Sequence, residues 1–214
     1  MEQFLIVAAV HLLALLSPGP DFFLVARTSL SSGWRIASGA CLGIATANGV
    51  FIIGAFAGTA ALRPDSTSFM VLQLVGCAYL LCLGVLFIRY AGADGLEGVP
   101  VRQRRVDGRA EQHLAWWRAA GMGFLSGMLN PKNALFYASL AAMLTRPHAS
   151  VSWKSFYGAW MFGIVLLWDL LVAVLIGNQA VLRRFARALP WLERGAGAVL
   201  IMLSVCVIAV VLTR

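Results

Sequence analysis

Long apolar segments dominate this chain and leave little of it for anything else. They cover residues 4–26, 36–62, 69–90, 119–144, 153–176 and 195–213. A helix needs about 20 apolar residues to cross a bilayer, and none of the segments alternates as a barrel strand would. Because lipid offers no hydrogen-bond partners, each segment is expected to be a helix. The predicted fold is an all-α polytopic membrane protein with six transmembrane helices.

The composition supports this class and removes others. Only 12% of the residues are charged, about half the usual share in soluble domains. A net charge of +8 would suggest nucleic acid in a soluble protein. Here the arginines lie between apolar segments, which favours topology signals and contacts with anionic membrane lipids over nucleic acid. The cysteines lie inside apolar segments without a metal-binding spacing, so no metal or other cofactor is expected.

The basic residues also predict an orientation. They concentrate after the first, third and fifth segments. These are Arg27, Arg35, Arg89, Arg102, Arg104, Arg105, Arg109, Arg118, Arg183, Arg184, Arg187 and Arg194, against Arg63, Arg146, Lys154 and Arg214 on the other side. Cytoplasmic loops carry the excess of Lys and Arg, so both termini are predicted to be periplasmic. The start, MEQFLIVAAV, lacks the basic region of a signal peptide, so the first segment is expected to be retained.

The two halves of the chain share a pattern. Residues 1–90 and 119–214 each contain three predicted spans, the first of which is interrupted at a proline, and residues 91–118 form a polar cytoplasmic linker loop. Because three is an odd number, the second triplet must enter the membrane from the opposite face. This pattern is typical of the inverted repeats of transporters, whose sites lie at broken helices. The alternative is that each proline only kinks its helix.

The first interruption is Ser17-Pro18-Gly19-Pro20-Asp21. Pro18 and Pro20 lack N–H groups, and Gly19 tolerates unusual dihedral angles, so together they are expected to open the helix. Asp21 then lies in the first turn of the second half. It either caps that turn or binds a substrate ammonium or a proton, since ionisable groups at membrane depth are usually functional.

The second interruption is Asn130-Pro131-Lys132-Asn133. Lys132 lies deep in its span and needs a carboxylate partner, for which Asp21 and Asp169 are the candidates. The structural interpretation is an ion pair that joins the repeats. The functional interpretation is that Lys132, with the N-terminus of the half-helix, holds a substrate carboxylate.

Several isolated polar and small residues complete the candidate set. Asp169 is in the middle of its span and would suit proton coupling, and Asn48 contacts either a ligand or another helix. His11 and Gln73 are expected to form interhelical hydrogen bonds. Stripes of small residues indicate either tight packing around a site or a dimer face. They are Gly39, Gly43, Ala47, Gly54, Gly58, Gly123 and Gly127.

Two stretches resemble a known family. LLALLSPGPDFFLVARTSLSSGWRIASGACLGIATAN and GMGFLSGMLNPKNALFYASL are similar to the lysine exporter and homoserine/threonine exporter (LysE/RhtB) family, over nearly the whole chain. The resemblance implies a bacterial inner-membrane exporter of amino acids or their analogues, driven by proton exchange, with a homodimer as one candidate assembly. By position, Pro18–Asp21 match its first-span motif and Asn130–Lys132 its fourth-span motif.

The sequence therefore predicts a secondary active transporter rather than an enzyme. Its substrate-binding residues are predicted to be Pro18, Gly19, Pro20, Asp21, Asn48, Asn130, Pro131, Lys132 and Asn133. Asp21 and Asp169 are predicted to couple protons. The alternative is a membrane structural or signalling subunit that transports nothing.

Overall fold

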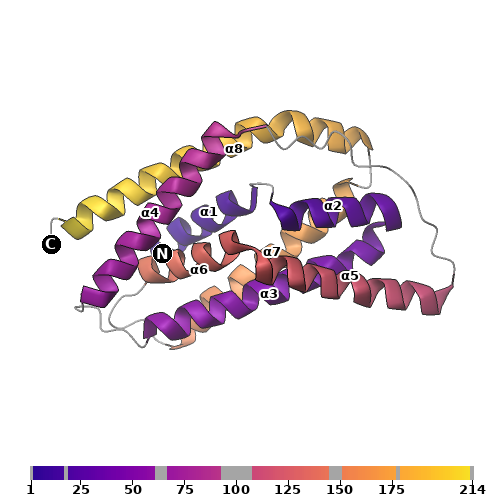
Figure 1. The fold of residues 1–214 in the computed structure, drawn as a ribbon, viewed down its shortest axis with the longest axis horizontal. Coiled ribbons are helices and arrows are strands. Elements are labelled where there is room, and N and C mark those ends of the chain that lie inside the picture. The colour runs from indigo at the N-terminus through magenta and orange to yellow at the C-terminus, as the bar shows by residue number, and fades with distance from the viewer. Residues whose placement is uncertain are drawn as a thin grey trace.

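The computed structural model describes residues 2–16, 19–60, 67–92, 108–144, 151–176 and 179–212. This part of the chain is all helical, without a strand (Figure 1). Its elements are α1 (Glu2–Leu16), α2 (Pro20–Ser32), α3 (Trp34–Ala60), α4 (Thr67–Arg89), α5 (Arg109–Leu129), α6 (Pro131–Leu144), α7 (Val151–Ile176) and α8 (Gln179–Leu212). The predicted all-α class is confirmed.

Both predicted interruptions divide a segment into two helices. Gly19 is in an extended conformation and Pro20 is the first residue of α2, which is bent by 57° from α1. Pro18 lies outside the described residues. Asn130 is non-helical and Pro131 starts α6. A proline suits a first helical position because the N–H that it lacks would have no partner there.

Three helices of the described chain are long and apolar enough to cross a membrane. They cover Trp34–Gly58, Ser152–Ile176 and Arg187–Ala209, and the bent pair α1–α2 passes the same test as one broken span. The protein is therefore a membrane protein. Two helices extend beyond their apolar segments: α5 begins at Arg109, inside the predicted linker, and α8 begins at Gln179 and passes through Pro190. Apolar patterning marks the lipid-facing part of a helix, whereas its backbone hydrogen bonds continue into polar sequence.

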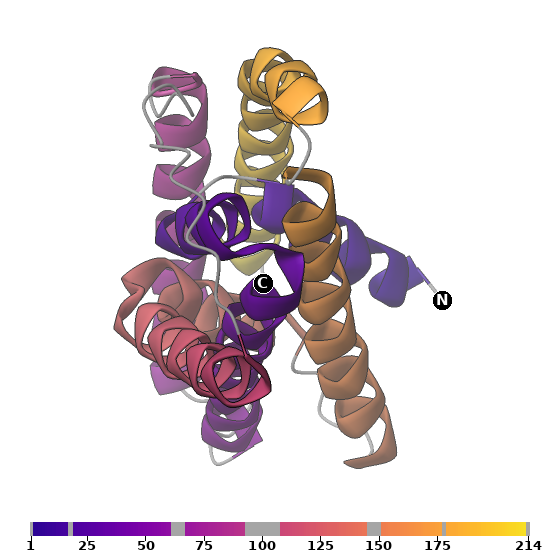
Figure 2. The ribbon, with the colours of Figure 1, turned by 90° about the vertical axis from the view of Figure 1, so that its right-hand side faces the viewer.

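Helix α3 lies at the centre of one half of the molecule, packed on α2, α5, α6 and α7, while α4 packs along α8 and on α6 (Figures 1 and 2). Two buried apolar clusters follow from this arrangement. One joins α2, α3 and α7 through residues such as Val25, Cys41 and Ala173. The other joins α1, α4, α6 and α8 through residues such as Leu80 and Leu200. The broken helices meet at the boundary of the two clusters.

The glycine stripes separate into two kinds. A Cβ on Gly43 would lie against the carbonyl oxygen of Ala120, and one on Gly123 against that of Ala40, both far inside van der Waals contact. A Cβ on Gly54 or Gly58 would have no described atom within 4 Å apart from the backbone of its own helix. The first kind therefore brings α3 and α5 together at backbone distance, which is the tight-packing alternative. Gly84 and Gly197 do the same for α4 and α8, where a Cβ on Gly84 would lie 2.7 Å from the Gly197 carbonyl oxygen.

Candidate functional site

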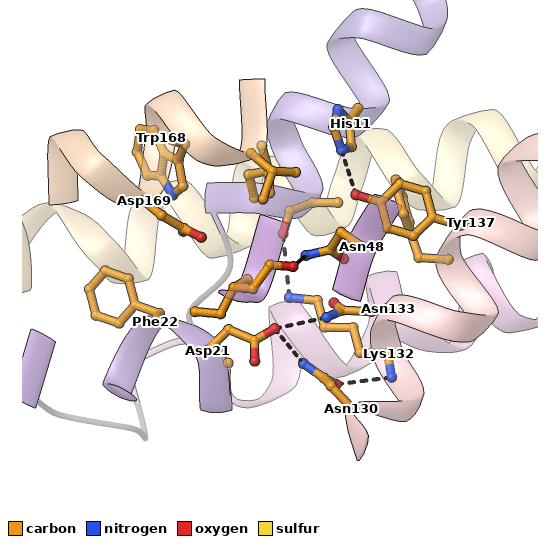
Figure 3. Close-up of a pocket in the computed structure, with 16 residues that line it drawn as sticks. His11, Asp21, Phe22, Asn48, Asn130, Lys132, Asn133, Tyr137, Trp168 and Asp169 are labelled. Atoms are coloured by element: carbon orange, nitrogen blue, oxygen red, sulfur yellow. Dashed lines mark hydrogen bonds between the residues drawn. The ribbon is translucent and has the colours of Figure 1, made fainter. Parts of the chain in front are cut away.

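A polar cavity of about 60 Å³ lies where the two breaks meet (Figure 3). This volume is room for a few water molecules. The cavity brings together most of the predicted site residues. These are Gly19, Asp21, Asn48, Asn130, Lys132, Asn133 and Asp169. Pro20 and Pro131 are the first residues of α2 and α6.

Asp21 connects the two breaks. Its Oδ1 accepts a hydrogen bond from the Ser126 hydroxyl at 2.6 Å. Its Oδ2 accepts from Asn130 Nδ2 at 3.1 Å and from Asn133 Nδ2 at 2.8 Å. Both carboxylate oxygens therefore bind donors from α5, α6 and the residue between them. Asp21 bridges the two half-helix pairs, and of the two alternatives predicted for it, the cap of α2 is not formed by a side-chain hydrogen bond.

Asn130 uses both ends of its amide. Nδ2 donates to Asp21, while Oδ1 accepts the backbone N–H of Lys132 at 3.1 Å. The second bond is an N-cap of α6. It occupies one of the N–H groups that the sequence suggested for a substrate carboxylate. The Asn130 side chain therefore both caps α6 and binds Asp21, which connects the start of α6 to the first break.

Lys132 is half-buried and points toward α1 and α4. Its Nζ donates to the carbonyl oxygen of Ala14 at 3.3 Å and lies 5.0 Å from the ring centroid of Phe87. The carbonyl oxygen of Lys132 accepts from the Tyr79 hydroxyl at 3.4 Å. Ala14 is in the last turn of α1, where carbonyl oxygens lack partners within the helix. The ammonium therefore meets the C-terminal end of the first half-helix, the favourable end for a cation.

Asp169, on α7, differs from Asp21. It is only 7% exposed, and its Oδ2 is buried without a hydrogen-bond partner among the described residues. Asn48 donates to the carbonyl oxygen of Ile44 at 3.0 Å within α3, so its Nδ2 contacts its own helix. The cavity thus contains one carboxylate with several donors and one with an oxygen that has none.

His11 and Tyr137 join α1 to α6 at one wall of the cavity. His11 Nε2 and the Tyr137 hydroxyl lie 3.0 Å apart, and His11 also stacks on Phe136. The interhelical hydrogen bond predicted for His11 is confirmed. The side chain of Gln73 lies outside the described residues.

The Tyr137→Phe substitution is expected to lower the free energy of unfolding by about 1–2 kcal/mol, because it leaves a buried nitrogen of His11 without its partner. Thermal unfolding of the purified protein in detergent measures this loss. Tyr90→Phe is the matched control, since Tyr90 is 56% exposed and its change is expected to be close to neutral. Equal stabilities for the two variants would contradict the assigned hydrogen bond.

Sequence reasoning missed several residues of the site. Ser126 precedes Asn130 by one helical turn, so its position on the same face was a usable signal. Trp168 and Tyr137 line the cavity, but aromatic residues in an apolar span give no such signal. Outside the cavity lining, Glu193 is buried in α8 and accepts the backbone N–H of Gly92 at 2.7 Å. It was overlooked because it precedes the apolar segment that was expected to contain the helix.

Apolar helices that break around a buried polar cavity are the architecture of a membrane transporter. The chain matches the model of the LysE type translocator over residues 12–210 and belongs to that family. It is a transporter and not an enzyme.

Named relatives carry the same class of function. The threonine efflux protein of Escherichia coli K12 is 30% identical over 202 residues, which are 91% of this chain and 92% of the relative. The homoserine/homoserine lactone efflux protein of Salmonella typhi is 30% identical over 62% of this chain and 59% of its own. The leucine efflux protein of Klebsiella pneumoniae is 28% identical over 71% and 66%. No solved structure matches the chain.

Proposed function

We propose that this protein exports amino acids or close analogues across the bacterial inner membrane by proton-coupled alternating access. The observation that carries the proposal is the polar cavity formed where the two broken segments meet at Asp21. The family and the amino acid efflux relatives support the substrate class. The substrate is proposed to bind among the residues of the breaks and Asn48.

A zwitterionic amino acid needs an acceptor for its ammonium and a donor for its carboxylate. The cavity offers Asp21 and Asp169 as carboxylates and Lys132 as a cation. We assign the substrate carboxylate to Lys132. Proton coupling through Asp21 or Asp169 stays a prediction, as do contacts with anionic lipids and a homodimer.

The helix packing supports movement of one half of the molecule against the other. Under the proposed inverted repeat, α3 corresponds to α7 and α4 to α8, and in the structure α3 packs on α7 and α4 on α8. Contacts between such equivalent helices are where one repeat would move as a rigid body against the other. The cavity of about 60 Å³ holds a few water molecules and is too small for a whole amino acid. Under this proposal, the two halves separate when substrate binds.

A second, larger cavity suggests the route of entry. It has a volume of about 660 Å³ and lies between α2, α3 and α5, with Arg27, Arg118 and Glu111 in its lining. Its arginines are consistent with the predicted cytoplasmic side, where Lys and Arg are in excess. On the opposite side, Phe4 lies 5.3 Å from Trp160 and Trp160 lies 5.7 Å from His11, measured between ring centroids. We propose that this aromatic group closes the outer side while the inner side admits substrate.

Transport in proteoliposomes tests the proposed function. Vesicles loaded with labelled L-threonine, L-homoserine or L-leucine are diluted into buffer that imposes a pH gradient, and empty vesicles give the background. Gradient-dependent release of at least one amino acid is the expected result. If none moves under any gradient, and partner proteins purify with the chain, the protein is a structural or signalling subunit instead.

The Lys132→Met substitution is expected to raise the dissociation constant of the transported amino acid roughly tenfold or more, because a hydrogen bond to a charged group contributes about 1.5–3 kcal/mol. Calorimetry compares the amino acid with its amide, which lacks the carboxylate. Lys154→Met, away from the cavity, is the matched control. If the variant weakens the amide as strongly as the acid, Lys132 does not bind the carboxylate.

A further inference from the structure

The two carboxylates of the cavity differ in the hydrogen bonds that they accept, and this difference suggests separate roles. Asp21 accepts three hydrogen bonds, distributed over both of its oxygens. Asn130 and Asn133 belong to the second break, and Ser126 lies one turn before it in α5. Most of the acceptor capacity of Asp21 is thus used to hold the broken helices together, and a substrate ammonium would compete with these donors.

The buried oxygen of Asp169 accepts no hydrogen bond from the described residues. The residue is 7% exposed, its Oδ2 has no partner among the described residues, and it lines the same cavity. Figure 3 shows its carboxylate directed into the space that the labelled residues enclose. A buried carboxylate oxygen without a donor is costly unless a cation or another donor reaches it. The Lys132 ammonium is directed elsewhere, toward Ala14 and Phe87.

The surroundings of Asp169 suit a small organic cation. Trp168 and Phe22 line the cavity next to it, and an indole face attracts an ammonium group. A primary ammonium has three N–H donors, so it can bind the carboxylate and keep one donor for water or another acceptor. An ammonium group is small enough to fit a cavity that holds a few water molecules, whereas a whole amino acid is too large for it.

We propose that Asp169, with Trp168 beside it, is the binding site for the primary ammonium of the transported amino acid, while Asp21 connects the two breaks. This inference rests on the proposed function and narrows it. It replaces the predicted proton-coupling role of Asp169 with direct substrate recognition. It also makes the ammonium a requirement for tight binding, so that 2-hydroxy acids bind poorly.

The test compares two ligands that differ in the proposed group. Calorimetry measures the binding of L-threonine and of 2,3-dihydroxybutanoate, in which a hydroxyl replaces the ammonium. The wild-type protein is expected to prefer threonine by at least about tenfold, as for one charge-assisted contact. Asp169→Asn is expected to remove that preference by weakening threonine alone. Asp169→Glu, which keeps the charge, is expected to restore part of it, and Trp168→Phe to retain more of it than Trp168→Ala.

Folding and coupling effects are separated by further measurements. Gel-filtration profiles and unfolding temperatures without ligand identify a variant that fails to fold. If Asp169→Asn fails to fold, the test relies on Asp169→Glu and on the comparison of Trp168→Phe with Trp168→Ala. Threonine counterflow, which needs no proton gradient, is expected to fall with Asp169→Asn. Unchanged threonine binding and counterflow, with gradient-driven transport lost, would overturn the proposal in favour of a proton site. A wild-type protein that moves no amino acid refutes the proposed function itself.

Discussion

Replacement of Asp21 by alanine is expected to reduce transport roughly a hundredfold or more and to lower the free energy of unfolding by about 3 kcal/mol. The carboxylate accepts hydrogen bonds from Ser126, Asn130 and Asn133. The alanine variant leaves these donors inside the protein without their acceptor, and each such donor costs about 1–3 kcal/mol. It also disconnects the first break from the second.

The measurements are initial rates in proteoliposomes and thermal unfolding in detergent. Ser126→Ala is the graded control, because it removes a single donor and leaves Asp21 bound to both asparagines; about 1 kcal/mol is expected for it. Asp21→Asn should fall between the two, since an amide offers one acceptor oxygen where the carboxylate offers two. Transport by Asp21→Ala at the wild-type rate would show that the breaks need no connection.

The Gly123→Ala substitution is expected to destabilise the protein by about 3 kcal/mol, or to prevent folding, because overpacking costs typically 1–3 kcal/mol and more where the neighbour cannot move. The added Cβ would meet the backbone of Ala40 in α3. A backbone carbonyl in the middle of a helix cannot rotate away as a side chain would. The two helices would therefore have to separate along their whole contact.

Gly121→Ala is the matched control for this prediction. Gly121 lies on the same helix, and apart from the backbone of that helix no described atom is within 4 Å of the position of its Cβ. Alanine is favoured over glycine inside a helix by about 0.8–1 kcal/mol, so this variant is expected to be neutral or slightly more stable. Yield and unfolding temperature of the purified variants measure both effects. Similar stability of the two variants would contradict the close packing of α3 and α5.

The fold could be predicted wherever a local chemical property decides it. Pro20 and Pro131 lack the N–H that continues a helix, so both breaks were predictable to the residue, and α2 and α6 start at these prolines. The limits of α5 and α8 were not, because helix propensity continues from Arg109 and Gln179 without an apolar pattern to mark it. The six spans and the inverted repeat remain predictions beyond the helices that the structure describes.

The candidate site was predictable as a set of residues but not as a set of contacts. Polar groups in apolar spans are conspicuous, and Asp21, Asn130, Lys132 and Asp169 all line one cavity. Nothing in the order of residues indicates that Asp21 receives several donors while an oxygen of Asp169 receives none from the part of the chain that the structure describes. The donors to Asp21 are more than a hundred positions away from it. The same holds for the glycines. The sequence does not distinguish Gly54 from Gly123, but only Gly123 packs against the backbone of another described helix.

The sequence by itself determined that the chain belongs in a membrane and where its helices break, because bilayer thickness and the missing N–H of proline act on neighbouring residues. Only the tertiary structure decided which carboxylate holds the breaks together, and which one faces the cavity with an oxygen that no described residue binds. It also decided which glycines bring helices into contact. These properties depend on groups from distant helices at the same point in space, and packing alone selects them.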